Sequence, residues 1–112
     1  MTILYADIKG FTDYSSEVEP KDVVTMLAAL FTRFDKVCVK YSLYKVYTIG
    51  DCYVALSFFD ASRRDPGREV NNMVQMALSM IGIIREVRRE IKFEGLDMRI
   101  GLHTVINYFI YD

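Results

Sequence analysis

Tyr5-Ala6-Asp7-Ile8-Lys9-Gly10-Phe11-Thr12 places a carboxylate at the end of an apolar run, with a glycine three residues later. The segment before Asp7, residues 2–6, is too short for a helix and is rich in β-branched and aromatic residues, which predicts a buried strand. Gly10 permits a sharp turn, and Thr12 is expected to cap a short helix over 13–17. The sequence therefore predicts a strand, a tight turn and a helix start in immediate succession.

A second stretch, Tyr47-Thr48-Ile49-Gly50-Asp51-Cys52-Tyr53, also joins a glycine to a carboxylate. The flanking runs, 43–49 and 52–59, both have the composition of strands, and a glycine at a two-residue connection is the usual signal of a hairpin. We expect the tip of this hairpin to meet the end of the first strand. Asp51 would then lie close to Asp7.

These two carboxylates predict a site for a divalent cation. Backbone N–H groups at a helix start favour an anion such as phosphate, whereas a neighbouring Asp repels it. A hard cation such as Mg²⁺ removes the conflict, because it binds one or two carboxylates and completes its shell with water and phosphate oxygens. Either motif alone is more often an ordinary turn or cap. Together, Asp7 and Asp51 predict a divided metal site.

Two long amphipathic helices are expected, because apolar residues recur at helical spacing over 20–41 and over about 69–93. Four charged residues between the apolar positions of the first helix are expected to face solvent: Arg33, Asp35, Lys36 and Lys40. The second helix is expected to end at Glu94-Gly95, with Glu86 and Glu90 paired to arginines of the same helix. Its predicted core stripe comprises Val70, Met73, Val74, Ala77, Leu78, Ile81, Ile84, Val87 and Ile91.

Residues 98–104 predict a last strand, which completes the order strand, helix, helix, strand, strand, helix, strand. This order predicts an α+β sandwich with helices on one face of a mainly antiparallel sheet. The 112 residues allow one small domain, and the net charge of −1 gives no electrostatic basis for binding nucleic acid. There is no signal peptide or apolar run near the roughly 20 residues of a membrane span. Cys38 and Cys52 have no metal-ligand spacing and are expected to be reduced packing residues of a cytosolic domain.

Four separated segments resemble the catalytic domains of class III adenylyl and guanylyl cyclases. They are Ala6-Asp7-Ile8-x-Gly10-Phe11-Thr12, Thr48-Ile49-Gly50-Asp51-Cys52-Tyr53, residues 72–80 and residues 98–104. The resemblance implies that family's ferredoxin-like core, β-α-α-β-β-α-β, with residues 1–104 as the N-terminal portion of a catalytic domain. The sequence of residues 45–53 most resembles that of the paired-domain guanylyl cyclases of protozoa.

The resemblance also implies an activity and a site. Class III cyclases convert a nucleoside triphosphate, here GTP in preference to ATP, to a 3′,5′-cyclic monophosphate and pyrophosphate, using two Mg²⁺ or Mn²⁺ ions. The implied partner is a second cyclase domain, and the parent protein can be membrane-attached. The implied metal ligands are Asp7, Asp51 and the carbonyl of Ile8. The implied phosphate donors are the backbone N–H groups of Gly10, Phe11 and Thr12.

The sequence departs from the family at two places. Tyr47 occupies the position where family members usually carry Glu for guanine or Lys for adenine, so we expect the metal-donating half of a paired site. Residues 105–112 replace the family's continuation, which carries an Asn and an Arg that stabilise the transition state. Our hypothesis is that this tail is a translated intron of a truncated gene; the alternative is a divergent end strand.

Two functions of different class follow from these departures. The first is the enzyme, which needs its missing C-terminal half and a partner domain. The second is a truncated, non-catalytic cyclase-like half-domain that acts by pairing or by weak nucleotide or metal binding. In either case the isolated chain is expected to form no detectable cyclic nucleotide with manganese.

Overall fold

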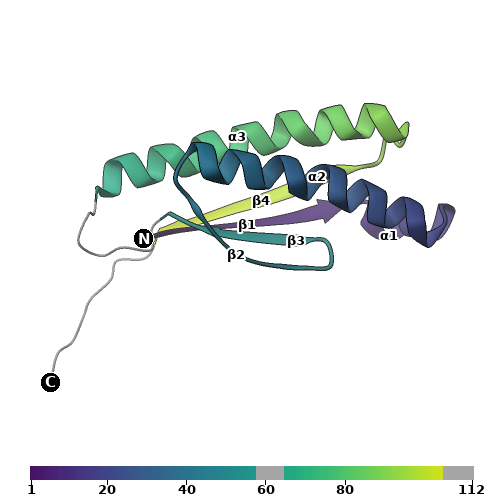
Figure 1. The fold of residues 1–112 in the computed structure, drawn as a ribbon, viewed down its shortest axis with the longest axis horizontal. Helices are drawn as coiled ribbons and strands as arrows, with labels where there is room; N and C mark the ends of the chain where they lie inside the picture. The colour runs from purple at the N-terminus through teal and green to yellow at the C-terminus, as the bar shows by residue number, and fades with distance from the viewer. Residues whose placement is uncertain (58–64, 105–112) are drawn as a thin grey trace, which may run out of the picture.

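The computed structural model describes residues 1–57 and 65–104 as a four-stranded antiparallel sheet with helices on one face (Figure 1). The strand order is β2-β3-β1-β4, the arrangement of a ferredoxin-like sheet. In chain order the elements are β1 (Thr2–Lys9), α1 (Phe11–Glu17), α2 (Pro20–Lys40), β2 (Tyr44–Ile49), β3 (Cys52–Leu56), α3 (Pro66–Ile91) and β4 (Asp97–Thr104). The predicted α+β sandwich and its element order are confirmed.

Alternation along the central strand places the core between the sheet and the helices. Leu4, Ala6 and Ile8 of β1 are buried, whereas Tyr5 between them is exposed. In the register with β3, Ala6 lies opposite Tyr53, which is also buried. Opposed residues on antiparallel strands share a face, so these side chains all point toward α2 and α3.

The two long helices complete this core, but not with the stripe predicted for α3. Four residues predicted to be buried are exposed: Val70, Val74, Leu78 and Ile81. The buried side chains of α3 are Met73, Met76, Met80, Ile84 and Val87, alongside Glu69. Apolar residues form two adjacent stripes on this helix, and periodicity does not say which stripe faces the sheet.

The ends of two helices also differ from prediction. Helix α1 begins at Phe11 and its N-cap residue is Gly10, so Thr12 lies in the first turn and its predicted capping role is wrong. Helix α3 ends at Ile91, where Lys92 adopts a left-handed conformation with φ of 55°. The predicted end at Glu94-Gly95 is therefore wrong.

Ion pairs join α2 to α3. Arg33 of α2 lies 3.3 Å from a carboxylate oxygen of Glu86 and 2.7 Å from one of Glu90. The predicted pairs within α3 are therefore wrong, because the neighbouring helix supplies the cation. Asp35 was predicted to face solvent, and its side chain is 45% exposed, but it also accepts a hydrogen bond from the buried Tyr53 hydroxyl at 2.7 Å.

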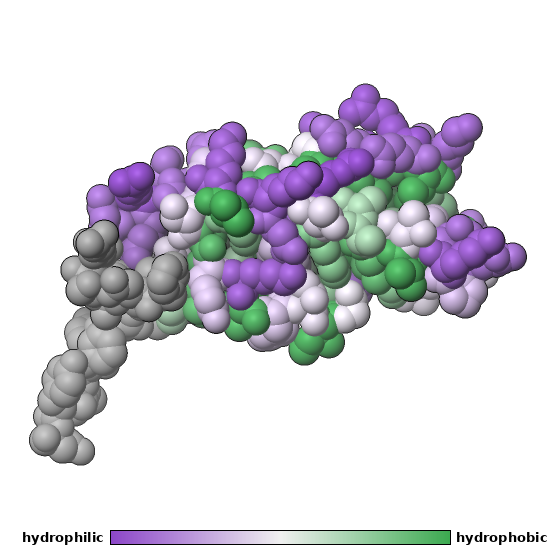
Figure 2. Space-filling model, viewed as in Figure 1, coloured by the Kyte–Doolittle hydropathy of each residue, from purple (hydrophilic) through white to green (hydrophobic). Residues whose placement is uncertain are grey.

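Hydrophilic side chains gather over α3 along the upper edge of the molecule in Figure 2. Within residues 1–57 and 65–104, no helix combines the length and the hydropathy that crossing a bilayer requires. The predicted tail, 105–112, and the last part of the predicted strand 52–59 lie outside the described residues. The predicted domain limits therefore stay a prediction.

Candidate metal centre

The turn between β1 and α1 depends on Gly10. Its φ of 82° lies in the left-handed region, where side chains with a Cβ are strained. A Cβ at this position would also overlap the backbone carbonyl oxygen of Gly95. Glycine thus allows the start of α1 to pack directly against the turn that precedes β4.

The hairpin tip reaches this turn through backbone pairing. Asp7 of β1 lies opposite Cys52 of β3 in the antiparallel register, so Asp51 is one position beyond the paired residues. The N–H of Ile8 donates a hydrogen bond to the carbonyl oxygen of Asp51 at 3.2 Å. Gly50, with φ of 54°, makes the tight turn before Asp51. Sheet register therefore places the two aspartates beside one another.

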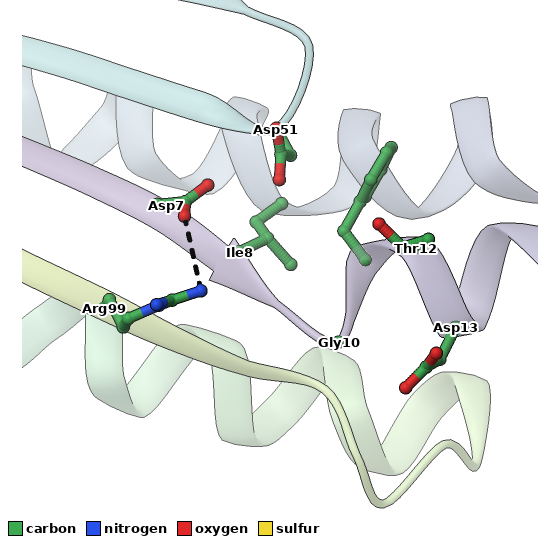
Figure 3. A pocket seen from close by; sticks show the side chains of 8 residues that line it. Asp7, Ile8, Gly10, Thr12, Asp13, Asp51 and Arg99 are labelled. Carbon is green, nitrogen blue, oxygen red and sulfur yellow. Dashed lines mark ion pairs between the residues drawn. The ribbon is translucent and has the colours of Figure 1, made fainter.

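A pocket of about 330 Å³ opens at this junction (Figure 3). All the residues that the sequence nominated for the site line it: Asp7, Ile8, Gly10, Phe11, Thr12 and Asp51. Figure 3 shows the Asp7 carboxylate on β1 and the Asp51 carboxylate at the hairpin tip on the same side of the pocket. The structure thus brings together every predicted ligand and phosphate donor.

The electrostatics of the pocket favour a cation. Burial raises the pKa of the Asp51 carboxyl, and Asp7 raises it further through a hydrogen bond and its negative charge. Burial also raises the pKa of the Cys52 thiol, with contributions from the charges of Asp7 and Asp51. A carboxylate whose charge is disfavoured by burial and by a neighbouring carboxylate is stabilised by a positive ion beside it.

The donor set fits a hard divalent ion. Two carboxylates meet at the pocket, and no group of three or more Asp, Glu, His or Cys side chains suited to a metal occurs in the described part of the chain. A closed zinc site uses four such protein ligands, whereas Mg²⁺ takes one or two carboxylates and leaves positions for water and phosphate. The residues present are therefore suited to Mg²⁺ or Mn²⁺ with an anionic ligand.

Two further residues line the pocket that sequence reasoning did not nominate. Arg99 of β4 lies opposite Asp7 in the sheet register, and its guanidinium nitrogen is 3.9 Å from an Asp7 carboxylate oxygen. Its side chain is 73% exposed, so the charge is available to a ligand. Asp13 lines the pocket from the first turn of α1. Pairing the predicted strand 98–104 with the first strand would have identified Arg99.

Replacing Asp51 with Asn is expected to stabilise the metal-free chain modestly. Because the folded-state pKa of Asp51 is raised, its ionised form destabilises the fold above that pKa. The penalty disappears as the pH falls and Asp51 becomes protonated. Thermal unfolding in a chelating buffer should give Asp51→Asn the higher midpoint at neutral pH, with a smaller difference near pH 4.

Asp13→Asn is the matched control, because Asp13 lines the same pocket without contributing to the pKa shift of Asp51. Its midpoint should show no corresponding gain. A lower midpoint for Asp51→Asn than for the unchanged chain at neutral pH would contradict the electrostatic account of the pocket.

Known proteins are similar to this chain in sequence and in fold. The family model of the adenylate and guanylate cyclase catalytic domain matches residues 1–106. Guanylate cyclase alpha of Plasmodium falciparum is 45% identical over 106 residues, and guanylate cyclase of Toxoplasma gondii is 47% identical over 107. Each match covers 92% of this chain but 2% of the relative.

A solved structure extends the comparison to three dimensions. The non-canonical dimeric guanylyl cyclase domain of the RhoGC fusion protein from the fungus Blastocladiella emersonii has a TM-score of 0.75 and 30% identity to this chain. The match covers 90% of this chain and 55% of the crystallised domain. The chain thus spans about half of that domain.

Proposed function

Because this chain belongs to the adenylate and guanylate cyclase catalytic domain family, we propose that it is the metal-donating part of a guanylate cyclase. The complete site would convert GTP to 3′,5′-cyclic GMP and pyrophosphate. One observation carries the proposal: residues far apart in the sequence, nominated from their chemistry, line a single pocket. The names of the two protozoan relatives favour GTP over ATP.

In this proposal Asp7, Asp51 and the Ile8 carbonyl hold two Mg²⁺ or Mn²⁺ ions. When bound, the ions neutralise phosphate charge and make the attacking 3′-hydroxyl more acidic. Asp7 belongs to β1 and Asp51 to the turn between β2 and β3, so the register of β3 with β1 fixes their relative position before any ligand binds. Such preorganisation lowers the cost of binding.

The phosphates would lie along the other side of the pocket. The backbone N–H groups of Gly10, Phe11 and Thr12 are the proposed donors to phosphate oxygens, since the start of α1 has no side-chain cap. Arg99, beside Asp7, adds a positive charge to the same edge. Arginine binds phosphate oxygens through a planar pair of N–H groups.

Base selection is proposed to come from a second cyclase domain. Tyr47 stands where a Glu or Lys would read the base, and its side chain is 42% exposed on β2. A tyrosine there carries no charge to separate guanine from adenine. The dimeric state of the fungal domain supports a paired arrangement.

Nucleotide binding by the chain tests this proposal. We expect a fluorescent GTP analogue to bind in the presence of Mn²⁺, to be released by a chelator, and to be displaced about equally by GTP and ATP. Removing the charge in Arg99→Ala should weaken binding about tenfold, the effect of one lost charged hydrogen bond. Arg89→Ala is the control, because Arg89 lies in the last turn of α3 and does not line the pocket.

If the affinity for the GTP analogue is the same without metal and in Arg99→Ala, the proposed site is wrong. The alternative function, a non-catalytic half-domain that pairs or binds ligand weakly, is distinguished by joining this chain to the C-terminal half of a cyclase domain and pairing it with a base-reading cyclase domain. Manganese-dependent cyclic GMP formation by the pair supports the enzyme. Binding of nucleotide without product in that pair supports the alternative.

A further inference from the structure

A buried tyrosine lies two residues after Asp51 on β3. Tyr53 is fully buried, and its hydroxyl donates a hydrogen bond to an Asp35 carboxylate oxygen at 2.7 Å. The Cys38 sulfur lies 3.2 Å from the same hydroxyl. Asp35 and Cys38 both belong to α2, so this contact joins the strand that follows Asp51 to the body of the domain.

The other strand of the hairpin reaches the same carboxylate. The ammonium nitrogen of Lys45, on β2, lies 3.1 Å from one Asp35 oxygen and 3.2 Å from the other. The same nitrogen lies 5.7 Å from the centre of the Tyr53 ring. Asp35 thus contacts both strands of the hairpin. We call Asp35, Cys38, Lys45 and Tyr53 the Asp35 cluster.

The edge strand of this hairpin has few other attachments, whereas β3 pairs with β1 along its length. All six residues of β2 are exposed, and β2 is an edge strand whose register with β3 shifts between Lys45 and Tyr47. Edge strands with an irregular register are weakly held by their own pairing. The Asp35 cluster therefore supplies a side-chain anchor where the backbone pairing is irregular.

We propose that Asp35 and Tyr53 are positioning residues for the candidate metal centre, because they anchor both strands of the hairpin and so steady the turn in which the β1–β3 register places Asp51 beside Asp7. Neither residue lines the pocket, so neither contacts the bound ion. Their effect on metal affinity is transmitted along β3 to Asp51. This inference rests on the proposed function, since it presupposes that Asp51 binds the metal.

The variant Tyr53→Phe isolates the hydroxyl. The Tyr53 ring packs against Phe31 and Phe34, with centroids 5.6 and 5.4 Å away, and phenylalanine keeps these contacts. Removing the hydroxyl leaves Asp35 with Lys45 but disconnects it from β3. Asp35→Asn changes the other partner of this hydrogen bond. It also removes the negative charge that Lys45 contacts.

Mn²⁺ affinity is the measurement, obtained from the loss of the free Mn²⁺ resonance in a paramagnetic resonance titration of the full chain. Tyr53→Phe and Asp35→Asn are each expected to weaken Mn²⁺ binding about tenfold, as for other residues that support metal ligands indirectly. Together they should weaken it by less than the product of the two effects, because they break one network.

Arg33→Gln is the matched control. Arg33 lies near Asp35 on α2 but pairs with Glu86 and Glu90 of α3, so its loss removes exposed ion pairs without touching the hairpin. Its Mn²⁺ affinity should equal that of the unchanged chain, even if its unfolding midpoint falls. A stability effect alone would lower the affinity of all three variants in step with their midpoints.

Different results would contradict the metal centre and the positioning role of Asp35 and Tyr53. If the unchanged chain binds no Mn²⁺, or if Asp51→Asn binds it equally well, the proposed metal centre is wrong. If the unchanged chain binds and Asp51→Asn does not, while folded Tyr53→Phe binds like the unchanged chain, the positioning role is wrong and the metal centre stands. Tyr53→Phe decides the question if Asp35→Asn does not fold.

Discussion

Asp7→Ala and Asp51→Ala are each expected to abolish Mn²⁺ binding by this chain and catalysis by a complete cyclase that contains it, without unfolding the domain. Each variant leaves one of the two carboxylates that are the proposed ligands. A hard cation held by one carboxylate and water loses most of its protein coordination. Catalytic loss should reach at least about a thousandfold, because the ions act on both the attacking and leaving oxygens.

The measurements are an Mn²⁺ titration, cyclic nucleotide formation and circular dichroism of the same samples. Asp13→Ala is the matched control, since it removes a third carboxylate from the lining of the pocket that is not a proposed ligand. It should retain Mn²⁺ binding within about twofold. Full activity in either Asp7→Ala or Asp51→Ala would refute the metal assignment.

Gly10→Ala is expected to cost about 3 kcal/mol or more of folding free energy, a large fraction of what a domain of this size has. Its φ of 82° strains any residue with a Cβ, and that Cβ would also overlap the Gly95 carbonyl oxygen. The Gly95 oxygen belongs to the backbone and the position of a Cβ is fixed by the backbone, so no side-chain rotation relieves the overlap. The start of α1 must move, and the lining of the pocket moves with it.

Gly50→Ala separates the two causes. Gly50 also has a positive φ, but nothing lies within 4 Å of the position of its Cβ. Its substitution should therefore cost only the conformational strain, about 1 kcal/mol. Urea unfolding of both variants gives the difference, which measures the contact between Gly10 and Gly95. If both variants lose the same free energy of unfolding, the overlap with the Gly95 oxygen does not contribute to the destabilisation.

Much of the fold was accessible from local pattern. A glycine and a short apolar run predict both the hairpin at Gly50-Asp51 and the strand before Asp7. Their meeting was inferred from chemistry, because two carboxylates near one phosphate site call for a cation. The register of β1 with β3 places them together as expected.

The errors and omissions at Asp35, Glu86 and Arg99 share one physical origin. The pattern of a helix or strand does not say which residues of other elements will lie beside it. Asp35 follows the buried Phe34 in a helix, and its spacing is that of a surface residue until the hairpin packs beside it. Glu86 had arginines nearby in sequence, but Arg33 of another helix lies closer in space. Arg99 entered the site only through the pairing of β4 with β1.

Asp7 lies on β1, Asp51 in the turn between β2 and β3, and Arg99 on β4, and this separation has a consequence for folding. Their strands meet only when the hairpin and β4 have both added to β1, so the pocket forms with the long-range pairings rather than before them. A ligand of this pocket therefore binds the native state and not the unfolded chain. At one hundred times its dissociation constant it would add about 2.7 kcal/mol to the free energy of unfolding. The cation would thus act as a folding ligand, and its stabilisation would extend to every backbone amide that exchanges only on global unfolding.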